Sequence, residues 1–272
     1  MSDILRAVIL GIVEGLTEFV PVSSTGHMIL VMPLLGIDEG DPSFRFWNGA
    51  FDIFIQLGAI LAVLIYFWRR LWRLTFRPAD TRWHEHILVK LLVAFIPAAV
   101  IGLLASDFIE DHLKNPSVTA TALVVGGVAI LLIEYFVRHP RITDAATISL
   151  RLAFTIGLIQ CLAMVPGTSR SGATIMGALA LGLTPAAAAE FSFFLAIPTM
   201  FAAGFYSLLK HIDEIGQDQW VILAVGFVVA FLVAWVVVAA FMRFIQSHKF
   251  TVFAVYRIIF GGAVLVYLLS RT

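Results

Sequence analysis

Six apolar stretches, each about 20 residues long, constrain the fold of this chain more than any other feature. They cover residues 49–68, 87–105, 119–136, 187–209, 221–242 and 252–269. A helix of about 20 apolar residues is long enough to cross the hydrocarbon layer of a bilayer. The chain is 60% hydrophobic and 13% charged, whereas soluble domains are about 25% charged. We therefore expect an all-α polytopic membrane protein with six transmembrane helices.

Two further apolar regions are interrupted by polar residues and do not resemble membrane spans. Residues 4–35 contain Glu14, Glu18 and the run PVSSTGH, and residues 150–183 contain Gln160 and the run PGTSRSG. Irregular backbone at membrane depth is tolerated only where protein or a water-filled cavity surrounds it. We predict that each region forms a re-entrant helix-loop-helix pair, which enters the membrane and returns on the same side.

The two interrupted regions resemble each other, with a one-residue shift near the prolines. Gly11, Glu14, Val20-Pro21, Ser23 and Gly26 align with Gly157, Gln160, Val165-Pro166, Ser169 and Gly172. Three spans follow each region, so the second half must begin on the opposite face of the membrane. We predict a single membrane domain, residues 1–272, built as an inverted-topology repeat of residues 1–140 and 141–272. Such repeats place their site where the halves meet.

The charges between the predicted spans indicate an orientation. Three loops are basic, with Arg69, Arg70, Arg73, Arg77 and Arg82, then Arg138, Arg141 and Arg151, then Arg243 and Lys249. The alternate loops carry Arg45, Lys114 and Lys210, the last two among Asp107, Glu110, Asp111, Asp213, Glu214 and Asp218. Basic loops stay in the cytoplasm. Both termini and the first re-entrant pair are then expected on the outer face.

Composition also excludes several classes of function and site. The net charge is zero, so there is no electrostatic basis for a nucleic-acid partner. Cys161 is the only cysteine, which excludes an intramolecular disulfide and a multi-cysteine metal site. The N-terminal residues have no small-residue cleavage site, and we expect them to be retained.

The first interrupted region carries two acids. Glu14 and Glu18 are four residues apart and share one face of a helix. Carboxylates in an apolar setting are costly unless they are protonated, paired or bound to a metal. Mg²⁺ is usually held by one or two carboxylates and by phosphate oxygens. We predict both acids as metal ligands and Glu18 also as a catalytic residue. A structural role, in which one acid reaches the surface or caps a helix, is the alternative.

Hydroxyl groups and a histidine follow Pro21. Free N–H groups at the start of a new helix favour an anion, whereas an ordinary N-cap would use only one of the hydroxyls. Ser24 and His27 lie within one helical turn, so the imidazole could approach the hydroxyl or protonate a leaving group. We predict Ser24 and His27 as catalytic, and Ser23 and Thr25 as substrate-binding.

The second interrupted region places an arginine among hydroxyl groups. The planar fork of Arg170 matches the oxygens of a phosphate. The neighbouring residues predicted to bind substrate are Ser169, Ser171 and Thr174. A buried arginine needs a partner, and Glu14 or Glu18 could provide one when substrate is absent. If both loops reach the middle of the membrane, the combined groups suit phosphoryl transfer.

Weaker signals lie within the spans. Gln56 and Glu190 could support the site or make ordinary hydrogen bonds between helices. Tyr256 and Arg257 are predicted to anchor the last span at the membrane interface.

At these residues the sequence resembles undecaprenyl-diphosphatase, the bacitracin-resistance family of bacterial inner-membrane lipid phosphatases. The matching segments are EGLTEFVPVSSTGH at residues 14–27, PGTSRSGAT at 166–174, FIQLG at 54–58 and EFSF at 190–193. The resemblance implies hydrolysis of undecaprenyl diphosphate to the monophosphate carrier of cell-wall synthesis, and bacitracin resistance. It also implies a divalent cation (Mg²⁺ or Ca²⁺) and an active site open to the periplasmic side. The functional residues carry over to Glu14, Glu18, Ser24, His27 and Arg170.

Two other classes of function are open to a chain with these features. Inverted repeats with paired re-entrant loops are common in transporters, so a polyprenyl-phosphate flippase is one alternative. An intramembrane serine protease using Ser24 and His27 is another, but it has no evident need for Glu14, Glu18 and Arg170. The oligomeric state is open, with a homodimer as one possible assembly.

Overall fold

The computed structural model describes residues 1–38, 40, 43–76, 82–113, 115–137, 140–211 and 215–270, with only the backbone at 106, 107, 110, 111, 210, 211 and 218. Several charges used for the orientation lie outside the described residues or side chains: Arg77, Lys114, Arg138, Asp213 and Glu214, and the side chains of Asp107, Glu110, Asp111, Lys210 and Asp218.

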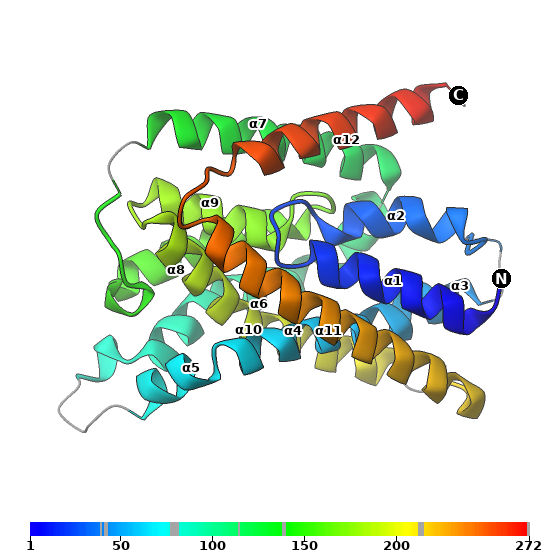
Figure 1. Cartoon of the computed structure of the whole chain (residues 1–272), viewed down its shortest axis with the longest axis horizontal. Coiled ribbons are helices and arrows are strands. Elements are labelled where there is room, and N and C mark those ends of the chain that lie inside the picture. The colour runs from blue at the N-terminus through cyan, green and yellow to red at the C-terminus, as the bar shows by residue number, and fades with distance from the viewer. Residues whose placement is uncertain are drawn as a thin grey trace.

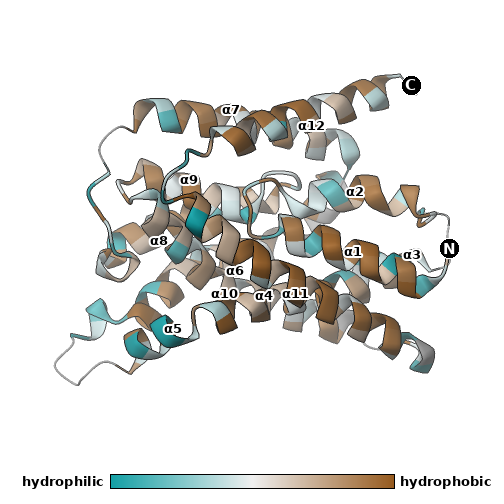
Figure 2. Ribbon diagram, in the orientation of Figure 1, coloured by the Kyte–Doolittle hydropathy of each residue, from teal (hydrophilic) through white to brown (hydrophobic). Residues whose placement is uncertain are grey.

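Within these residues, six helices are long and apolar enough to cross a membrane. The first is Phe44–Tyr66, which comprises α3 (Phe44–Phe46), a π-helical turn (Trp47–Phe51) and α4 (Asp52–Tyr66). The other five are α6 (Ile87–His112), α7 (Pro116–Phe136), α10 (Pro185–His211), α11 (Trp220–Phe244) and α12 (Thr251–Leu269). They run roughly along the long axis of the molecule (Figure 1). Hydrophobic residues dominate their length (Figure 2). The predicted all-α, six-span fold is confirmed.

The described chain also contains two pairs of shorter helices, α1 (Asp3–Thr17) with α2 (Ser24–Leu34) and α8 (Leu150–Gln160) with α9 (Arg170–Ala180). At 1.5 Å per residue, α1 is about 22 Å long and the others about 16 Å, less than the roughly 30 Å hydrocarbon layer. α1 and α2 run in opposite directions and meet at a loop near the middle of the molecule (Figure 1). These lengths and this reversal fit re-entrant pairs, whose depth in a bilayer stays a prediction.

Several helix contacts in the two halves of the chain correspond to each other. α1 packs on α11, and its counterpart α8 packs on α6. α4 likewise packs on α11, and its counterpart α10 packs on α6. α7 and α12, which end the two halves, pack on each other. These three kinds of contact therefore occur in both halves with the roles of the halves exchanged.

The two loops share an unusual backbone conformation. Ser23 has φ 71° and Ser169 has φ 73°, and these are the only described non-glycine residues with positive φ. Each serine caps the following helix by accepting from a backbone N–H, that of Gly26 or that of Gly172. Positive φ is uncommon outside glycine. Its occurrence at two aligned positions supports the alignment of the halves made from sequence.

Small residues hold the short helices close to the spans. A Cβ added at Gly157 of α8 would lie 2.0 Å from the carbonyl oxygen of Ala94 in α6. A Cβ added at Gly15 of α1 would lie 2.9 Å from the carbonyl oxygen of Ala230 in α11. Small residues at such contacts let helix backbones approach closely in membranes. These two close helix contacts fix the positions of α1 and α8, and therefore the point at which each interrupted loop begins.

Candidate active site

The two interrupted loops meet at the centre of the molecule and are bonded together. The hydroxyl of Ser171 donates to the carbonyl oxygen of Val20 over 3.0 Å. Arg257 donates to the carbonyl oxygens of Pro21, Gly167 and Thr168 at 3.2, 2.9 and 2.9 Å. The two loops, one from each predicted half of the chain, therefore lie against each other.

Arg257 is buried and holds the two loops together through these hydrogen bonds. Its predicted role as an interface anchor is wrong. Its side chain is 0% exposed and also donates to the carbonyl oxygens of Ala122 and Leu123 in α7. A Cβ added at Gly126 would lie 2.2 Å from its Nη2 atom, so this glycine makes room for the guanidinium. This role could not be predicted from the sequence, because all five acceptors are backbone carbonyls.

Three of the predicted residues form a hydrogen-bonded group. Ser24, at the start of α2, donates from its hydroxyl to Glu18 Oε2 over 2.6 Å. Arg170, at the start of α9, donates from Nη2 to Glu18 Oε1 over 3.3 Å. The side chains of Arg170 and Glu18 are only 12% and 11% exposed. One carboxylate thus bridges a hydroxyl from the first loop and a guanidinium from the second.

A cavity of about 210 Å³ adjoins this group. Its polar lining residues are Glu18, Ser23, Ser24, Thr25, Gln56, Ser169, Arg170 and Thr199. Most of the predicted site residues therefore face one space, and Gln56 joins them. The Nε atom of Arg170 is buried and has no hydrogen-bond partner among the described residues. Hydroxyls and a guanidinium around one small cavity can bind an oxyanion such as phosphate.

Ser171 and Thr174, predicted to bind substrate, lie behind the cavity. Both are completely buried, and neither lines it. The hydroxyl of Thr174 donates to the carbonyl oxygen of Arg170 at 2.8 Å and lies 2.5 Å from the hydroxyl of Ser192. Together with the bond from Ser171 to the first loop, these contacts hold the backbone that presents Arg170.

His27 does not approach Ser24 in this structure. Its Nδ1 lies 2.7 Å from the carbonyl oxygen of Ser23, and its Nε2 lies 2.6 Å from the hydroxyl of Tyr256. A carbonyl only accepts, so Nδ1 carries a proton in this arrangement. The ring stacks on Phe260 with centroids 4.4 Å apart. Sequence reasoning found His27 but missed its partner Tyr256, which lies in the last span.

Glu14 is buried one helical turn before Glu18. Its side chain is 1% exposed, and Oε1 has no hydrogen-bond partner in the described part of the chain. An unpartnered buried carboxylate oxygen suits a cation ligand. Among the described residues, no group of three or more His, Cys, Asp or Glu could hold a metal ion. Glu14 and Glu18 would therefore rely on substrate and water oxygens to complete a coordination shell, as Mg²⁺ sites often do.

Glu190 lies outside the cavity lining. It accepts from Arg70 at 3.2 Å, and Arg70 also donates to Asp144 at 2.5 Å. Of the two roles considered for Glu190, the structure shows the interhelical contact, which ties α10 to α5 (Trp68–Thr75).

An apolar groove of about 540 Å³ continues from the polar cavity, between α6 and α10. Arg170, Thr199, Ala163 and Ala203 line both spaces. The groove is otherwise mainly apolar, with Phe95, Ala98, Ala99, Gly102, Leu103, Met164, Ala202 and Tyr206 among its lining residues. Leu103 and Tyr206 are 67% and 55% exposed, so the groove opens on the outside of the helix bundle. A polar head and a long apolar chain would fit the two spaces together.

Comparison with known proteins identifies relatives along nearly the whole chain. A protein named undecaprenyl-diphosphatase from Rhodopseudomonas palustris is 47% identical over 261 residues, 96% of each chain. Undecaprenyl-diphosphatase 2 of Paramagnetospirillum magneticum is 50% identical over 267 residues, 98% of this chain and 100% of its own. An undecaprenyl-diphosphatase of Rhizorhabdus wittichii is 48% identical over 274 residues, 99% of both chains. The family model described as bacitracin resistance protein BacA matches residues 7–263, and the chain therefore belongs to that family.

Proposed function

We propose that this membrane protein hydrolyses undecaprenyl diphosphate to undecaprenyl phosphate and inorganic phosphate. In a bacterium, this reaction recycles the lipid carrier for cell-wall synthesis and confers bacitracin resistance. The observation that carries the proposal is the polar cavity around Ser24, Glu18 and Arg170, which continues into an apolar groove. The relatives are named as diphosphatases, so the flippase alternative is not favoured.

In the proposed reaction, the Ser24 oxygen attacks the terminal phosphorus of the diphosphate. Glu18 Oε2 already accepts the Ser24 hydrogen bond, so this carboxylate can take the proton as the oxygen–phosphorus bond forms. The bond from the terminal phosphorus to the bridging oxygen breaks, and undecaprenyl phosphate leaves. Water then hydrolyses the phosphoserine and releases inorganic phosphate. Direct attack by water is the competing route, in which no phosphoserine forms.

Arg170 and His27 have different roles in this scheme. Arg170 binds the terminal phosphate oxygens and stabilises the charge that develops on them. His27 positions the loop, because its Nδ1 hydrogen bonds the carbonyl of Ser23, the residue with positive φ. Ser23, Thr25 and Ser169 bind the substrate in this scheme, since all three line the cavity. Ser171 and Thr174 are positioning residues for the second loop.

A divalent cation, Mg²⁺ or Ca²⁺, is part of the proposal. Glu14 and Glu18 would hold it, and when bound it would neutralise charge on the phosphate oxygens. The unpartnered oxygen of Glu14 supports this assignment. All residues in the scheme come from one chain, so a homodimer would add nothing to the site itself.

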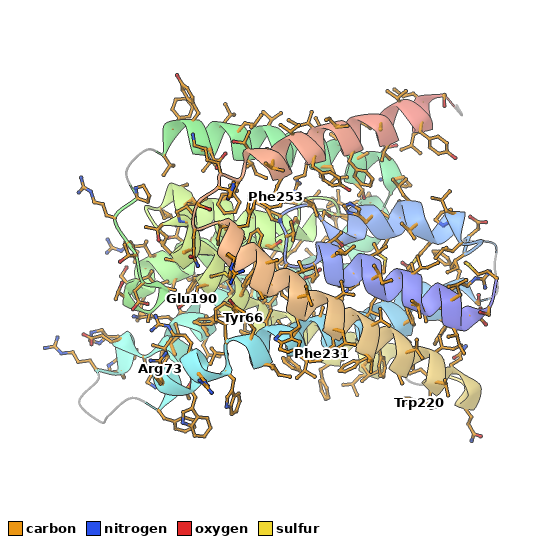
Figure 3. The ribbon with its side chains drawn as sticks, in the orientation of Figure 1. Tyr66, Arg73, Glu190, Trp220, Phe231 and Phe253 are labelled. Carbon is orange, nitrogen blue, oxygen red and sulfur yellow. The ribbon has the colours of Figure 1, made fainter. Side chains whose placement is uncertain are left out.

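We also propose that the protein lies in the bacterial inner membrane with its site open to the periplasm. Arg73 and Trp220 lie near opposite ends of the molecule (Figure 3). The basic end that contains Arg73 would face the cytoplasm. Thiol-labelling of single cysteines introduced at these two positions, after Cys161→Ser, would test the orientation in intact cells.

A phosphate-release assay tests the function. Purified protein with undecaprenyl diphosphate is expected to release one phosphate for each undecaprenyl phosphate formed, and excess chelator should abolish the reaction until Mg²⁺ or Ca²⁺ is restored. Ser24→Ala should lower kcat at least about 100-fold by removing the nucleophile, whereas Ser270→Ala, at an exposed serine, should not. Transport of lipid without phosphate release would contradict the proposal. Phosphoserine trapped on wild-type protein would support the covalent route over direct water attack.

Gly102→Leu is expected to impair long-chain substrates selectively. Gly102 lines the apolar groove, where a Cβ would lie 3.5 Å from Met164. A leucine side chain there would occupy the space proposed for the prenyl chain, at a cost of about 1–3 kcal/mol. We expect KM for undecaprenyl diphosphate to rise about tenfold, with little change for a short prenyl diphosphate.

Gly262→Leu is the matched control for this variant. Gly262 lies in the span α12, and nothing lies within 4 Å of a Cβ added there. Its kinetics should match wild type with both substrates. Equal losses on long and short chains in Gly102→Leu would show that the groove does not hold the prenyl chain.

A further inference from the structure

The short helix α5 (Trp68–Thr75) places tryptophan and arginine side by side at one end of the molecule. Trp68 and Trp72 are four residues apart, as are Arg69 and Arg73, so each pair shares a face of the helix. The two tryptophan rings contact each other with centroids 5.5 Å apart, and their side chains are 57% and 52% exposed. This surface is both aromatic and cationic.

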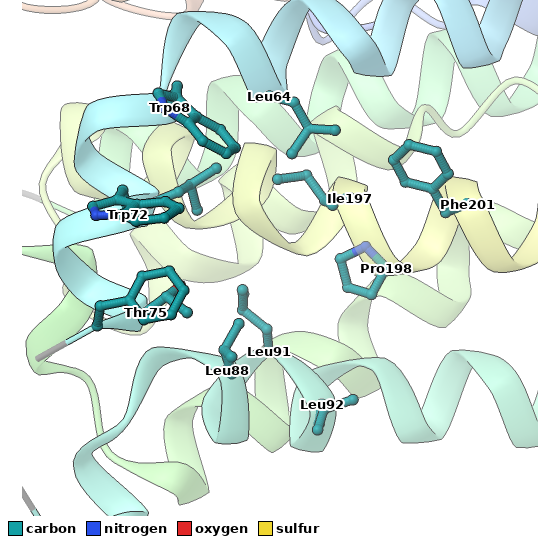
Figure 4. A pocket seen from close by; sticks show the side chains of 12 residues that line it. Leu64, Trp68, Trp72, Thr75, Leu88, Leu91, Leu92, Ile197, Pro198 and Phe201 are labelled. Carbon is teal, nitrogen blue, oxygen red and sulfur yellow. The ribbon is translucent and has the colours of Figure 1, made fainter.

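Beneath α5 lies an apolar cavity of about 670 Å³, separate from the site described above. It lies between α4, α5, α6 and α10 (Figure 4). Its walls include Leu64, Trp68, Trp72, Leu88, Leu92 and Phe201. Among the described residues that line it, only Thr75 carries a hydroxyl group. Its volume is within the range of about 300–1,000 Å³ typical of small-molecule sites.

A second hollow, of about 530 Å³, adjoins this cavity on the surface. It is lined by Trp68, Arg69, Trp72 and Arg73. The two tryptophans line both spaces, so a molecule could extend from the arginines past the aromatic rings into the apolar cavity. That shape and polarity match an amphiphile with a negatively charged head.

The arginines of α5 differ in their partners. Arg70 is neutralised by Asp144 and Glu190. Arg69 and Arg73 are exposed and form no ion pair with any residue that the structure describes, while Arg73 Nε donates to the carbonyl oxygen of Arg69 at 3.3 Å. Two positive charges one turn apart are thus available to an anion outside the protein. The anion expected at the basic end of a membrane protein is a lipid phosphate.

We propose that α5 and the cavity beneath it form a binding site for an anionic glycerophospholipid. The lipid phosphate lies against Arg69 and Arg73, and one acyl chain passes Trp68 and Trp72 into the apolar cavity. Tryptophan side chains favour this depth at the membrane interface, and cytoplasmic leaflets are rich in anionic lipids. The proposal does not depend on the reaction at Ser24.

Lipid binding to purified wild-type protein would test this site. Detergent-solubilised protein is titrated with phosphatidylglycerol or with phosphatidylcholine of the same chains, and bound lipid is counted by native mass spectrometry. We expect one phosphatidylglycerol to bind with clear preference over phosphatidylcholine. Arg69→Gln/Arg73→Gln should weaken this binding by roughly fivefold for each arginine removed. Raising the salt concentration should weaken the same preference.

Two further variants distinguish a specific lipid-binding site from non-specific attraction of anionic lipid to positive charge. Arg151→Gln/Arg243→Gln removes two exposed arginines that line neither space, and it should leave binding unchanged. Leu92→Trp keeps both α5 arginines but fills part of the apolar cavity, so it should also weaken binding. Two results would overturn the proposal. One is an equal loss of phosphatidylglycerol binding in the two double-arginine variants, and the other is no preference for phosphatidylglycerol in the wild-type protein. Phosphate release by all three variants should stay near wild type, which also reports that they are folded.

Discussion

Arg170→Ala is expected to lower kcat/KM for phosphate release by about a thousandfold. Arg170 lines the polar cavity and the apolar groove, and its Nε atom has no partner in the described chain. Removing one preorganised donor from a developing oxyanion typically costs about 10²–10³ in rate. A guanidinium supplies two such donors together with a positive charge. Steady-state kinetics with undecaprenyl diphosphate measures the loss.

Two controls make this result specific to phosphate binding. Arg170→Lys keeps the charge but loses the planar fork, so its kcat/KM should fall between wild type and Arg170→Ala. Arg70→Ala breaks a different arginine–carboxylate group outside the cavity, and its kcat should stay within about threefold of wild type, since no substrate contact is lost. Thermal melting of each variant confirms that folded protein is compared. More than a tenth of wild-type kcat/KM in Arg170→Ala would refute the phosphate-binding role.

Arg257→Met should be nearly as damaging, although Arg257 does not line the reaction cavity. The substitution keeps much of the side-chain volume but leaves the carbonyls of Pro21, Gly167 and Thr168 without this donor. Each buried carbonyl left unsatisfied costs about 1–3 kcal/mol. We expect a loss of stability of about 3 kcal/mol or more, seen as a lower Tm. With the loops no longer held together, kcat should fall at least about 100-fold.

Arg257→Lys separates the hydrogen bonds from the shape of the side chain. A lysine ammonium has three donors and can satisfy part of the carbonyl set, so Tm and kcat should be partly restored. Arg243→Met, at an exposed arginine in the last turn of α11, should change neither quantity. Wild-type Tm and kcat in Arg257→Met would show that the two loops do not need the hydrogen bonds from Arg257.

The spans could be predicted from sequence because one physical requirement dominates them. A helix that crosses the bilayer needs about 20 predominantly apolar residues. Hydropathy therefore predicted that a span begins at Ile87, as α6 does, and that the last span ends at Leu269, as α12 does. The start of α3 at Phe44 was missed, since residues 44–48 include Arg45 and Asn48. The positive φ of Ser23 and Ser169 could not be predicted from the residue type, because serine is equally common in ordinary turns.

The candidate site was only partly predictable, for a different reason. Glu18, Ser24 and Arg170 stood out because polar groups are rare inside apolar segments. Their arrangement depends on contacts between distant parts of the chain, such as the pair of His27 with Tyr256. Spacing within one helix suggested that His27 would approach Ser24. The rotation of α2 instead turns the imidazole toward α12, where it meets Tyr256. The Ser24 hydroxyl donates its hydrogen bond to the carboxylate of Glu18.

The opening of the apolar groove between α6 and α10 has a kinetic consequence. A substrate that enters from the side never leaves the bilayer, so enzyme and substrate meet by diffusion in two dimensions. The concentration that governs the rate is then the mole fraction of substrate among all lipids, and the volume of surrounding water is irrelevant. Diluting the membrane with inert phospholipid would slow turnover at a constant amount of substrate per litre. A KM for this protein is therefore meaningful only as a surface density.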